Sequence, residues 1–394
     1  MFNFKTFNNI AEDGLDILRK NKFKEVSENP DGILLRSHNL LKEDFEDNLL
    51  CIARAGAGTN NIPKDDATKK GIVVFNTPGA NANAVKELVI CGMLLSSRGI
   101  VEGIEFAKNL NLEDSEGLNQ AMEAQKKTFA GNELAGKTLG IVGLGSIGSM
   151  LAEAAHTLGM KLIGYDPYIS IEGAWRLPRE VEKAETMEAL LQQSDYVSLH
   201  VPLVEDTKNL INESNLRKFK KGARLINLSR GGIVNANHVI TELENGNLGR
   251  FVTDFPTPEL IKRSAEKNDV VLLPHIGAST KEAEVNCAVM AANQMVNYLQ
   301  DGTILNSVNF PRISLSRGTN HRLVIINHNE PGMIGKIADS IATCNINIAE
   351  MTNKSRDEIA INLIDLECKA SEELINQLRS VDHVMSVRSL NISS

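Results

Sequence analysis

The chain has 394 residues, of which 42% are hydrophobic and 23% are charged, and its formal net charge at pH 7 is −8. This composition is typical of a globular protein long enough for two or three domains, and the negative charge argues against a nucleic-acid partner. No apolar run reaches the length of a membrane span, and the five scattered cysteines include no CxxC pair. We therefore expect reduced thiols, no metal site, no membrane partner and a cytoplasmic location.

Residues 1–94 alternate strand patterns with amphipathic helix patterns, which predicts a small α/β unit. Arg36 and Ser37 follow one predicted strand, and Ala57 and Gly58 lie in the glycine-rich turn after another. Because ligands collect at the carboxyl ends of strands in open α/β sheets, these positions are candidates for anion binding, although an ordinary turn remains an alternative. The expected strands are 4–7, 23–26, 32–35, 50–54 and 72–75, and the expected helices are 12–20 and 42–49.

The segment 84–97 is apolar on most sides, which predicts a buried helix that crosses from the first domain to the second. Residues 100–135 are more polar. We interpret them as an arm between domains that can contact a second subunit.

A glycine-rich fingerprint follows, between two predicted strands. The strand 139–142 runs into GLGSIG at 143–148, and after a helix pattern the next strand ends at Asp166. Gly143 permits the tight turn, Gly145 lets the backbone approach a pyrophosphate, and Gly148 lets helix and strand pack closely. Asp166 can accept hydrogen bonds from both ribose hydroxyls and repels a 2′-phosphate, so the expected cofactor is NAD rather than NADP.

Three polar residues lie at or just beyond the ends of later predicted strands, namely Arg230, Glu259 and His275. A secondary alcohol that gives a hydride to nicotinamide needs a base for its hydroxyl proton, and His275 is the natural candidate. Glu259 could hold the far ring nitrogen, and Arg230 could bind a carboxylate. Each residue alone also admits a plain structural role, whereas the three on successive strand ends favour chemistry.

After a short serine-rich linker, residues 320–394 predict the order strand, helix, strand, strand, helix, strand. The strands are expected at 321–327, 348–354, 358–368 and 384–391, and the helices at 333–343 and 371–380.

The segments GLGSIG, HVPL, NLSRGGIV, DFPTPE and PHIGAST resemble, in this order, the NAD-dependent D-2-hydroxyacid dehydrogenase family. RSHNL, RAGAGTNNI and NTPGAN resemble that family's substrate-domain motifs, so the resemblance covers essentially the whole chain. It implies two Rossmann-like doubly wound domains, and the C-terminal segment resembles an α+β ACT regulatory domain. The implied division is a substrate domain of 1–94 with 289–318, an NAD domain of 95–288 and an ACT domain of 319–394.

The resemblance also implies roles for single residues. Arg230 would grip the substrate carboxylate together with the backbone at Ala57 and Gly58, His275 would be the acid/base, and Glu259 would orient it. Arg36, with Ser37 beside it, and Arg54 are the candidates for a substrate phosphate. In the ACT segment, Asn329 and Asn347 match positions that hold serine in serine-inhibited relatives. The NAD site would be lined by Gly143, Gly145, Ser146, Ile147, Gly148, Asp166, His200, Pro202, Thr207, Leu228, Asp254 and Gly277.

The implied reaction is the oxidation of D-3-phosphoglycerate with NAD to 3-phosphooxypyruvate, the first step of L-serine biosynthesis, in a homodimer or homotetramer that serine can regulate. Asn327 stands where a histidine is frequent, and Glu330 stands where a basic residue is usual, which puts serine inhibition in question. One alternative is a hydroxypyruvate/glyoxylate or 2-oxoglutarate reductase of the same family. Another is an NAD-sensing binding protein.

Overall fold

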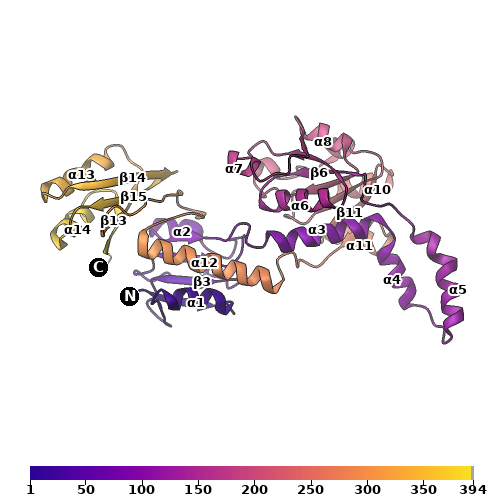
Figure 1. Ribbon diagram of the computed structural model, residues 1–394, viewed down its shortest axis with the longest axis horizontal. Helices are drawn as coiled ribbons and strands as arrows, with labels where there is room; N and C mark the ends of the chain where they lie inside the picture. Colours follow the sequence, from indigo (N-terminus) through magenta and orange to yellow (C-terminus); the bar gives the residue numbers. More distant parts are fainter. Residues whose placement is uncertain (392–394) are drawn as a thin grey trace. The chain divides into compact units, whose positions relative to one another are not determined.

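The computed structural model describes residues 1–391 and divides into two compact units (Figure 1). The first unit joins Met1–Asn81 with Lys281–Ser394, and the second is Ala82–Thr280. The finer division into substrate, NAD and ACT domains remains a prediction. Among residues 1–391, no helix has both the length and the apolar character that a membrane crossing requires.

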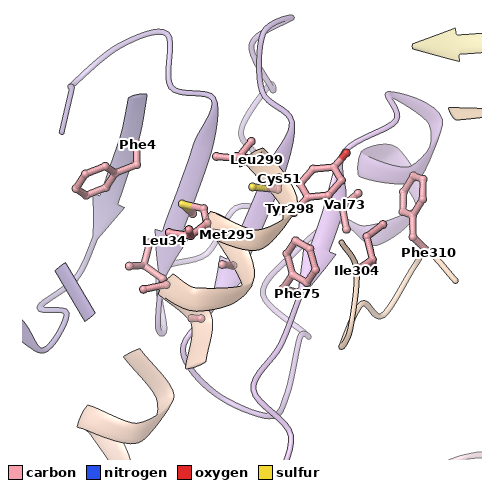
Figure 2. Close-up of a cluster of buried hydrophobic side chains, with 14 of the residues drawn as sticks. Phe4, Leu34, Cys51, Val73, Phe75, Met295, Tyr298, Leu299, Ile304 and Phe310 are labelled. Carbon is pink, nitrogen blue, oxygen red and sulfur yellow. The ribbon is translucent and has the colours of Figure 1, made fainter. Parts of the chain in front are cut away.

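The first unit is built on a parallel sheet with the strand order β2-β1-β3-β4-β5. Side chains alternate between its faces, so Leu34 packs with α1 and α12 while Ile33 and Leu35 pack on the opposite face with α2. Figure 2 shows the first of these cores. The elements are β1 (Asn3–Phe7), α1 (Glu12–Lys20), β2 (Lys24–Glu25), β3 (Gly32–Leu35), β4 (Cys51–Arg54), α2 (Lys64–Lys69), β5 (Val73–Phe75) and α12 (Lys281–Asp301).

The prediction of a helix at 42–49 is wrong, because this segment forms turns. Its aspartate and asparagine side chains compete with the helical backbone for hydrogen bonds. Phe45 and Leu49 pack with Leu40 in the core under the sheet, which stabilises the irregular path. The sequence patterns also missed α2, which begins directly after Pro63.

The second unit contains a parallel sheet with the order β12-β11-β10-β9-β6-β7-β8. The chain adds β7 and β8 on one side of β6 and then β9 to β12 on the other, so the winding direction reverses between β6 and β9. Ligands of doubly wound sheets bind at such a switch point. The strands are β6 (Thr138–Val142), β7 (Lys161–Tyr165), β8 (Val181–Lys183), β9 (Tyr196–Leu199), β10 (Ala223–Asn227), β11 (Leu248–Thr253) and β12 (Val270–Leu272). Parallel sheets in both units confirm the Rossmann-like class.

Helices α3 (Ala82–Ser97) and α6 (Ser146–Thr157) cover one face of this sheet. The opposite face packs against α8, α9, α10 and α11. The remaining helices of this sheet region are α7 (Ile171–Ala174), α8 (Met187–Gln193), η2 (Glu205–Thr207), α9 (Glu213–Leu216), α10 (Ala236–Glu244) and α11 (Pro258–Glu266).

The expected arm at 100–135 is a helical hairpin that projects from the sheet of the second unit (Figure 1). It consists of α4 (Ile100–Lys108), α5 (Ser115–Gln125) and η1 (Lys126–Phe129). Neither α4 nor α5 contains a buried residue. The hairpin nevertheless carries large apolar side chains, and Ile104, Met122 and, between the two helices, Leu112 are exposed.

The C-terminal segment has the predicted order strand, helix, strand, strand, helix, strand, which confirms that expectation. Its strands form an antiparallel sheet in the order β14-β15-β13-β16. Leu323 and Ile325 of β13 face α13 and α14, whereas Val324 and Ile326 join the core of the first unit. The elements are β13 (His321–His328), α13 (Met333–Thr343), β14 (Ile348–Arg356), β15 (Ile359–Leu366), α14 (Glu372–Arg379) and β16 (Val384–Asn391).

Candidate functional site

The glycine loop at 143–148 leaves β6 at the switch point of the second sheet. Gly143 has a φ of +92°, and a Cβ there would lie 2.6 Å from the carbonyl oxygen of His200. A Cβ on Gly148 would lie 2.1 Å from the carbonyl oxygen of Gly143. Both distances are too short for real Cβ atoms, so the turn and the close packing of α6 each require glycine.

Gly145 differs, because apart from its own atoms and its two chain neighbours nothing in the described chain lies within 4 Å of the Cβ position there. It is the N-cap of α6, and among residues 1–391 no side chain caps this helix end. The first-turn N–H groups of α6, which no intrahelical carbonyl can satisfy, therefore border open space that a pyrophosphate can fill.

Asp166 ties the end of β7 to this loop. Its Oδ2 accepts a hydrogen bond from the Leu144 N–H at 2.8 Å, and its Oδ1 accepts one from the Tyr168 N–H at 3.0 Å. Each carboxylate oxygen keeps a lone pair that can accept from a ribose hydroxyl. The fixed negative charge beside the glycine loop suits NAD and opposes a 2′-phosphate.

His200 and the loop after it form another border of the switch point. The Nε2 atom of His200 lies 2.9 Å from Ser198 Oγ, and burial lowers the pKa of His200 to about 4. The Thr207 hydroxyl donates to the Pro202 carbonyl oxygen at 2.5 Å and accepts from the Val204 N–H at 2.8 Å. The imidazole of His200 is therefore neutral at pH 7. The hydrogen bonds of the Thr207 side chain close the loop 202–207.

The other predicted cofactor residues differ in exposure. Leu228 is buried in the core that contains α3 and α6, and a Cβ on Gly277 would lie 3.4 Å from Val85 of α3. Ser146 is exposed and Ile147 is half-buried in the first turn of α6. The first pair thus shapes the framework, while the second pair is available to a ligand.

A cavity of about 400 Å³ opens at the ends of β10, β11 and β12, and its lining includes Asp254, Phe255 and His275. Asp254 is 2% exposed, and within the described chain its buried Oδ1 has no hydrogen-bond partner. Burial raises the pKa of Asp254, and the nearby positive charges of His275 and Arg230 oppose this shift. An unpaired buried acceptor beside a cavity fits a ligand that donates a hydrogen bond, as the carboxamide of nicotinamide does.

The three candidate catalytic side chains all belong to the second unit and are exposed. Arg230 Nη1 donates to the Ser229 carbonyl oxygen at 2.6 Å, and the His275 ring meets Phe255 edge-on with centroids 5.0 Å apart. Glu259 lies in the first turn of α11, where hydrogen bonds from its own N–H and from Thr257 lower its pKa.

No hydrogen bond or ion pair joins His275 to Glu259 in the part of the chain that the structure describes. Catalytic hydrogen bonds often tighten only when substrate is bound. Their pairing stays a prediction, as do the catalytic roles of all three residues.

In the first unit, Arg36 and Arg54 lie at neighbouring strand ends, with the Arg54 Nε donating to the Arg36 carbonyl oxygen at 2.9 Å. Arg54 Nη1 also donates to the carbonyl oxygen of Gly58. The guanidinium of Arg36 is held by Glu284 of α12, with Nη1 and Oε1 2.6 Å apart. Sequence reasoning missed Glu284, because a partner so distant along the chain leaves no local pattern.

Ser37 and Ala57 are fixed through their backbones. The Ser37 N–H donates to Asn8 Oδ1 at 2.9 Å, and the Ala57 carbonyl oxygen accepts from Asn76 Nδ2 at 2.7 Å. The structure thus groups those predicted substrate residues that belong to the first unit at one edge of its sheet, whereas Arg230 and His275 belong to the second unit. Their binding roles remain predictions.

The two predicted regulatory asparagines lie at opposite ends of β15. Asn329 donates through Nδ2 to the Asp357 carbonyl oxygen at 3.2 Å, before β15 begins. Asn347 donates through Nδ2 to Glu367 Oε1 at 2.8 Å, just after β15 ends. A strand of this length spans roughly 25 Å, so one small ligand cannot touch both residues of a single chain.

The comparisons with known proteins first define a class. The family model described as the NAD-binding domain of D-isomer-specific 2-hydroxyacid dehydrogenases matches residues 100–277. The solved D-mandelate dehydrogenase of Rhodotorula graminis shares the fold, with a TM-score of 0.65 at 24% identity over 80% of this chain and 99% of its own.

Curated relatives carry the likeness over nearly the full length. The D-3-phosphoglycerate dehydrogenase of Haemophilus influenzae is 34% identical over 94% of this chain and 88% of its own, and that of Escherichia coli K12 is 33% identical over 94% and 89%. The chain therefore belongs to the D-isomer-specific 2-hydroxyacid dehydrogenase family, whose members are NAD-dependent enzymes. Among solved relatives, the NAD-bound 3-phosphoglycerate dehydrogenase of Entamoeba histolytica has a TM-score of 0.59 at 26% identity over 78% of this chain and 98% of its own.

Proposed function

We propose that this enzyme oxidises D-3-phosphoglycerate with NAD to 3-phosphooxypyruvate, the first step of L-serine biosynthesis. The observation that carries the proposal is the similarity to D-3-phosphoglycerate dehydrogenases over nearly the whole chain. The arrangement of the strand-end residues supports it, because His275 lines the cavity and Arg230 directly precedes Gly231, which also lines it.

In the proposed reaction, His275 accepts the proton of the substrate hydroxyl group, and its exposure at the cavity leaves the ring accessible to that proton. Arg230 binds the substrate carboxylate with its planar fork of N–H donors. Glu259 stabilises the protonated His275 once substrate has drawn the two together. NAD, when bound, supplies the acceptor for the hydride.

The substrate phosphate is assigned to Arg36 or Arg54. Glu284 already offsets part of the Arg36 charge, and this is the observation that favours the alternative of an unphosphorylated 2-hydroxy or 2-oxo acid substrate. The test is kcat/KM for D-3-phosphoglycerate against D-glycerate. We expect kcat/KM to be at least about 100-fold higher for the phosphorylated substrate, because about 3 kcal/mol of charge-assisted hydrogen bonding corresponds to a ratio of this size. Values within a factor of a few would refute the phosphate assignment and favour a hydroxypyruvate/glyoxylate or 2-oxoglutarate reductase.

We also propose that the C-terminal segment is an ACT regulatory domain with serine as its effector. Its element order supports this assignment. Asn327 is a departure with a structural consequence, since it is buried and its Oδ1 accepts from Asn362 Nδ2 at 2.8 Å. Serine would therefore rely on fewer polar groups, and the test is enzyme activity with and without millimolar serine. Activity that serine does not change would refute serine as the effector of this domain.

The proposed assembly is a homodimer or homotetramer, with the α4–α5 hairpin as one contact between subunits. Its apolar side chains are exposed, which is the common signature of a subunit interface. All five cysteines lie in the described chain as free thiols, which supports the proposed cytoplasmic location.

A further inference from the structure

Glu284 is a carboxylate that pairs with one of the two arginines at the substrate edge of the first unit. It lies in the first turn of α12, and its Oε1 is 2.6 Å from Nη1 of Arg36. This is the distance of a charge-assisted hydrogen bond between a guanidinium and an anion. The exposed fraction is 38% for the Arg36 side chain and 44% for that of Glu284, so a ligand can reach both groups from solvent.

Arg36 and Arg54 are bound by partners of different kinds. Arg54 donates through Nε to the Arg36 carbonyl oxygen at 2.9 Å and through Nη1 to the Gly58 carbonyl oxygen. A Cβ on Gly56 would lie 3.1 Å from the same Nη1, so the Arg54 guanidinium lies against the loop that follows β4. The Arg36 guanidinium is paired with a side chain instead. A side chain can rotate away, whereas a backbone carbonyl group is fixed, so Arg36 is the arginine whose partner a ligand can replace.

The backbone of α12 is held in place behind Glu284. Cys287 and Ala288, one turn further along, are buried, and a Cβ on Gly14 of α1 would lie 2.8 Å from Ala288. Displacement of Glu284 from Arg36 therefore requires rotation of its side chain and no shift of the helix. The displaced carboxylate would stay in the first turn of α12, where the positive end of the helix dipole favours negative charge. Because an exposed ion pair contributes little free energy, the exchange of partner costs little.

We propose that Glu284 is an internal counter-ion of the phosphate site, which the phosphate group of the substrate displaces from Arg36. This inference rests on the proposed function, because it takes Arg36 as a ligand of the substrate phosphate. A phosphate group binds a guanidinium more strongly than a carboxylate does, since it carries roughly twice the charge and offers three acceptor oxygens. A substrate without phosphate leaves the pair of Arg36 and Glu284 intact. Glu284 thus lowers the affinity for phosphate and keeps Arg36 paired when no substrate is bound.

The test is isothermal titration calorimetry of the full chain with inorganic phosphate, without NAD, so that its result does not depend on turnover. Glu284→Gln removes the charge and keeps the size of the side chain. It should tighten the Kd for phosphate about threefold to fivefold, as expected for the loss of one exposed ion pair. A Kd that is unchanged or weaker in Glu284→Gln overturns the proposal, because Glu284 would then only support Arg36. Absence of phosphate binding from both chains overturns it as well.

Glu282→Gln is the matched control for the change in charge. Glu282 is an exposed carboxylate in the same turn of α12, and among residues 1–391 it forms no ion pair. Its replacement removes the same charge from the same helix end and should leave the Kd for phosphate unchanged. Equal tightening in Glu282→Gln and Glu284→Gln would be a general effect of net charge and would overturn the proposal.

A double variant tests whether Glu284 acts through Arg36. Arg36→Gln should weaken the Kd for phosphate about tenfold, as the loss of one charge-assisted hydrogen bond predicts. The double variant Arg36→Gln/Glu284→Gln should bind phosphate no more tightly than Arg36→Gln does, because the counter-ion then has no guanidinium to release. Tighter binding by the double variant would mean that Glu284 repels phosphate from a distance, which contradicts the proposal.

Steady-state kinetics separate this inference from the proposed function. Glu284→Gln should lower KM for D-3-phosphoglycerate about threefold to fivefold and leave kcat nearly unchanged, since the ground state and the transition state carry the same phosphate. KM for D-glycerate should not change. An active enzyme with an unchanged KM for D-3-phosphoglycerate in Glu284→Gln refutes the role of Glu284 alone. A chain that shows the expected Kd values but does not oxidise D-3-phosphoglycerate refutes the proposed function, while the counter-ion role of Glu284 stands.

Discussion

Two histidines at strand ends of the second sheet meet different surroundings. His275 is exposed at the edge of a cavity, beside Phe255. His200 lies against Ser198, and burial lowers its pKa to about 4. An exposed imidazole can take a proton from a bound substrate, whereas the buried one stays neutral at pH 7.

Replacement of His275 by asparagine should remove the proton acceptor and leave the cofactor site intact. We expect kcat to fall by about 10²–10⁴, the usual contribution of general acid–base catalysis. The Kd for NADH, measured by fluorescence titration, should change little. His156→Asn is the control, since His156 is an exposed histidine on α6, and retained turnover in His275→Asn would show that another group is the base.

The buried His200 also predicts how stability depends on pH. Its pKa is about 4 in the folded chain against an ordinary value of 6.5, so below the higher value the unfolded chain binds a proton that the folded chain does not. Stability should therefore fall as pH drops from 6.5 toward 4, by roughly 2 kcal/mol on reaching about pH 5. In urea unfolding, the free energy of unfolding of His200→Gln should fall by roughly 2 kcal/mol less than that of the unmodified chain between pH 6.5 and about pH 5. His156→Gln should lose as much stability as the unmodified chain. Equal acid sensitivity in both variants would mean that His200 titrates normally.

Residue-level prediction succeeded where local backbone geometry decides the residue. Gly143 and Gly148 could be assigned from sequence, because a tight turn and a close helix approach exclude a Cβ. The pairing of Arg36 with Glu284 could not, because it depends on how α12 packs on the first sheet. The unpaired Oδ1 of Asp254 is likewise a property of the folded cavity.

At the scale of elements, strong periodicity was the reliable guide. The predicted helices 12–20 and 333–343 have the bounds of α1 and α13, and both carry one apolar face. The segment 42–49 was wrongly predicted as a helix because its apolar residues have a helical spacing. In the structure these residues reach the core from turns. Tertiary packing, rather than local propensity, determined its conformation.

The α4–α5 hairpin yields a prediction about assembly. Met122→Lys places a charge among the exposed apolar side chains of the hairpin, so it should shift sedimentation from an oligomer toward a monomer. Gln120→Lys adds the same charge to a polar position of α5 and should leave the sedimentation coefficient unchanged. If Met122→Lys sediments as the unmodified chain does, the hairpin is not the interface.

At the scale of the whole chain, two arginines, one in the segment before β13 and one in β16, join the C-terminal part of the chain to α12. Arg317 donates to the Gln300 carbonyl oxygen at 2.8 Å, and Arg388 to that of Tyr298 at 3.2 Å. Both carbonyl groups belong to the last turn of α12, and that of Tyr298 also accepts a hydrogen bond from the Gly302 N–H at 2.9 Å. Strand patterns predicted the C-terminal elements, but not that β13 is buried on both faces, because this requires the core of the first unit.

The ion pair of Arg322 with Asp365 is fully buried and bidentate, with distances of 2.6 and 2.9 Å. Arg322→Met should cost about 3–5 kcal/mol in urea unfolding, because it leaves a buried carboxylate without its cation. The double variant Arg322→Met/Asp365→Leu should recover most of this loss. A single variant as stable as the unmodified chain would mean that water reaches Asp365.

The proposed function is one reaction, so its most direct test is the initial rate of NADH formation when the purified full chain is given D-3-phosphoglycerate and NAD. We expect sustained NADH formation, and a much lower rate with NADP because the Asp166 carboxylate repels its 2′-phosphate. Absence of NADH formation with this substrate, in a preparation that binds NAD, would contradict the proposed function.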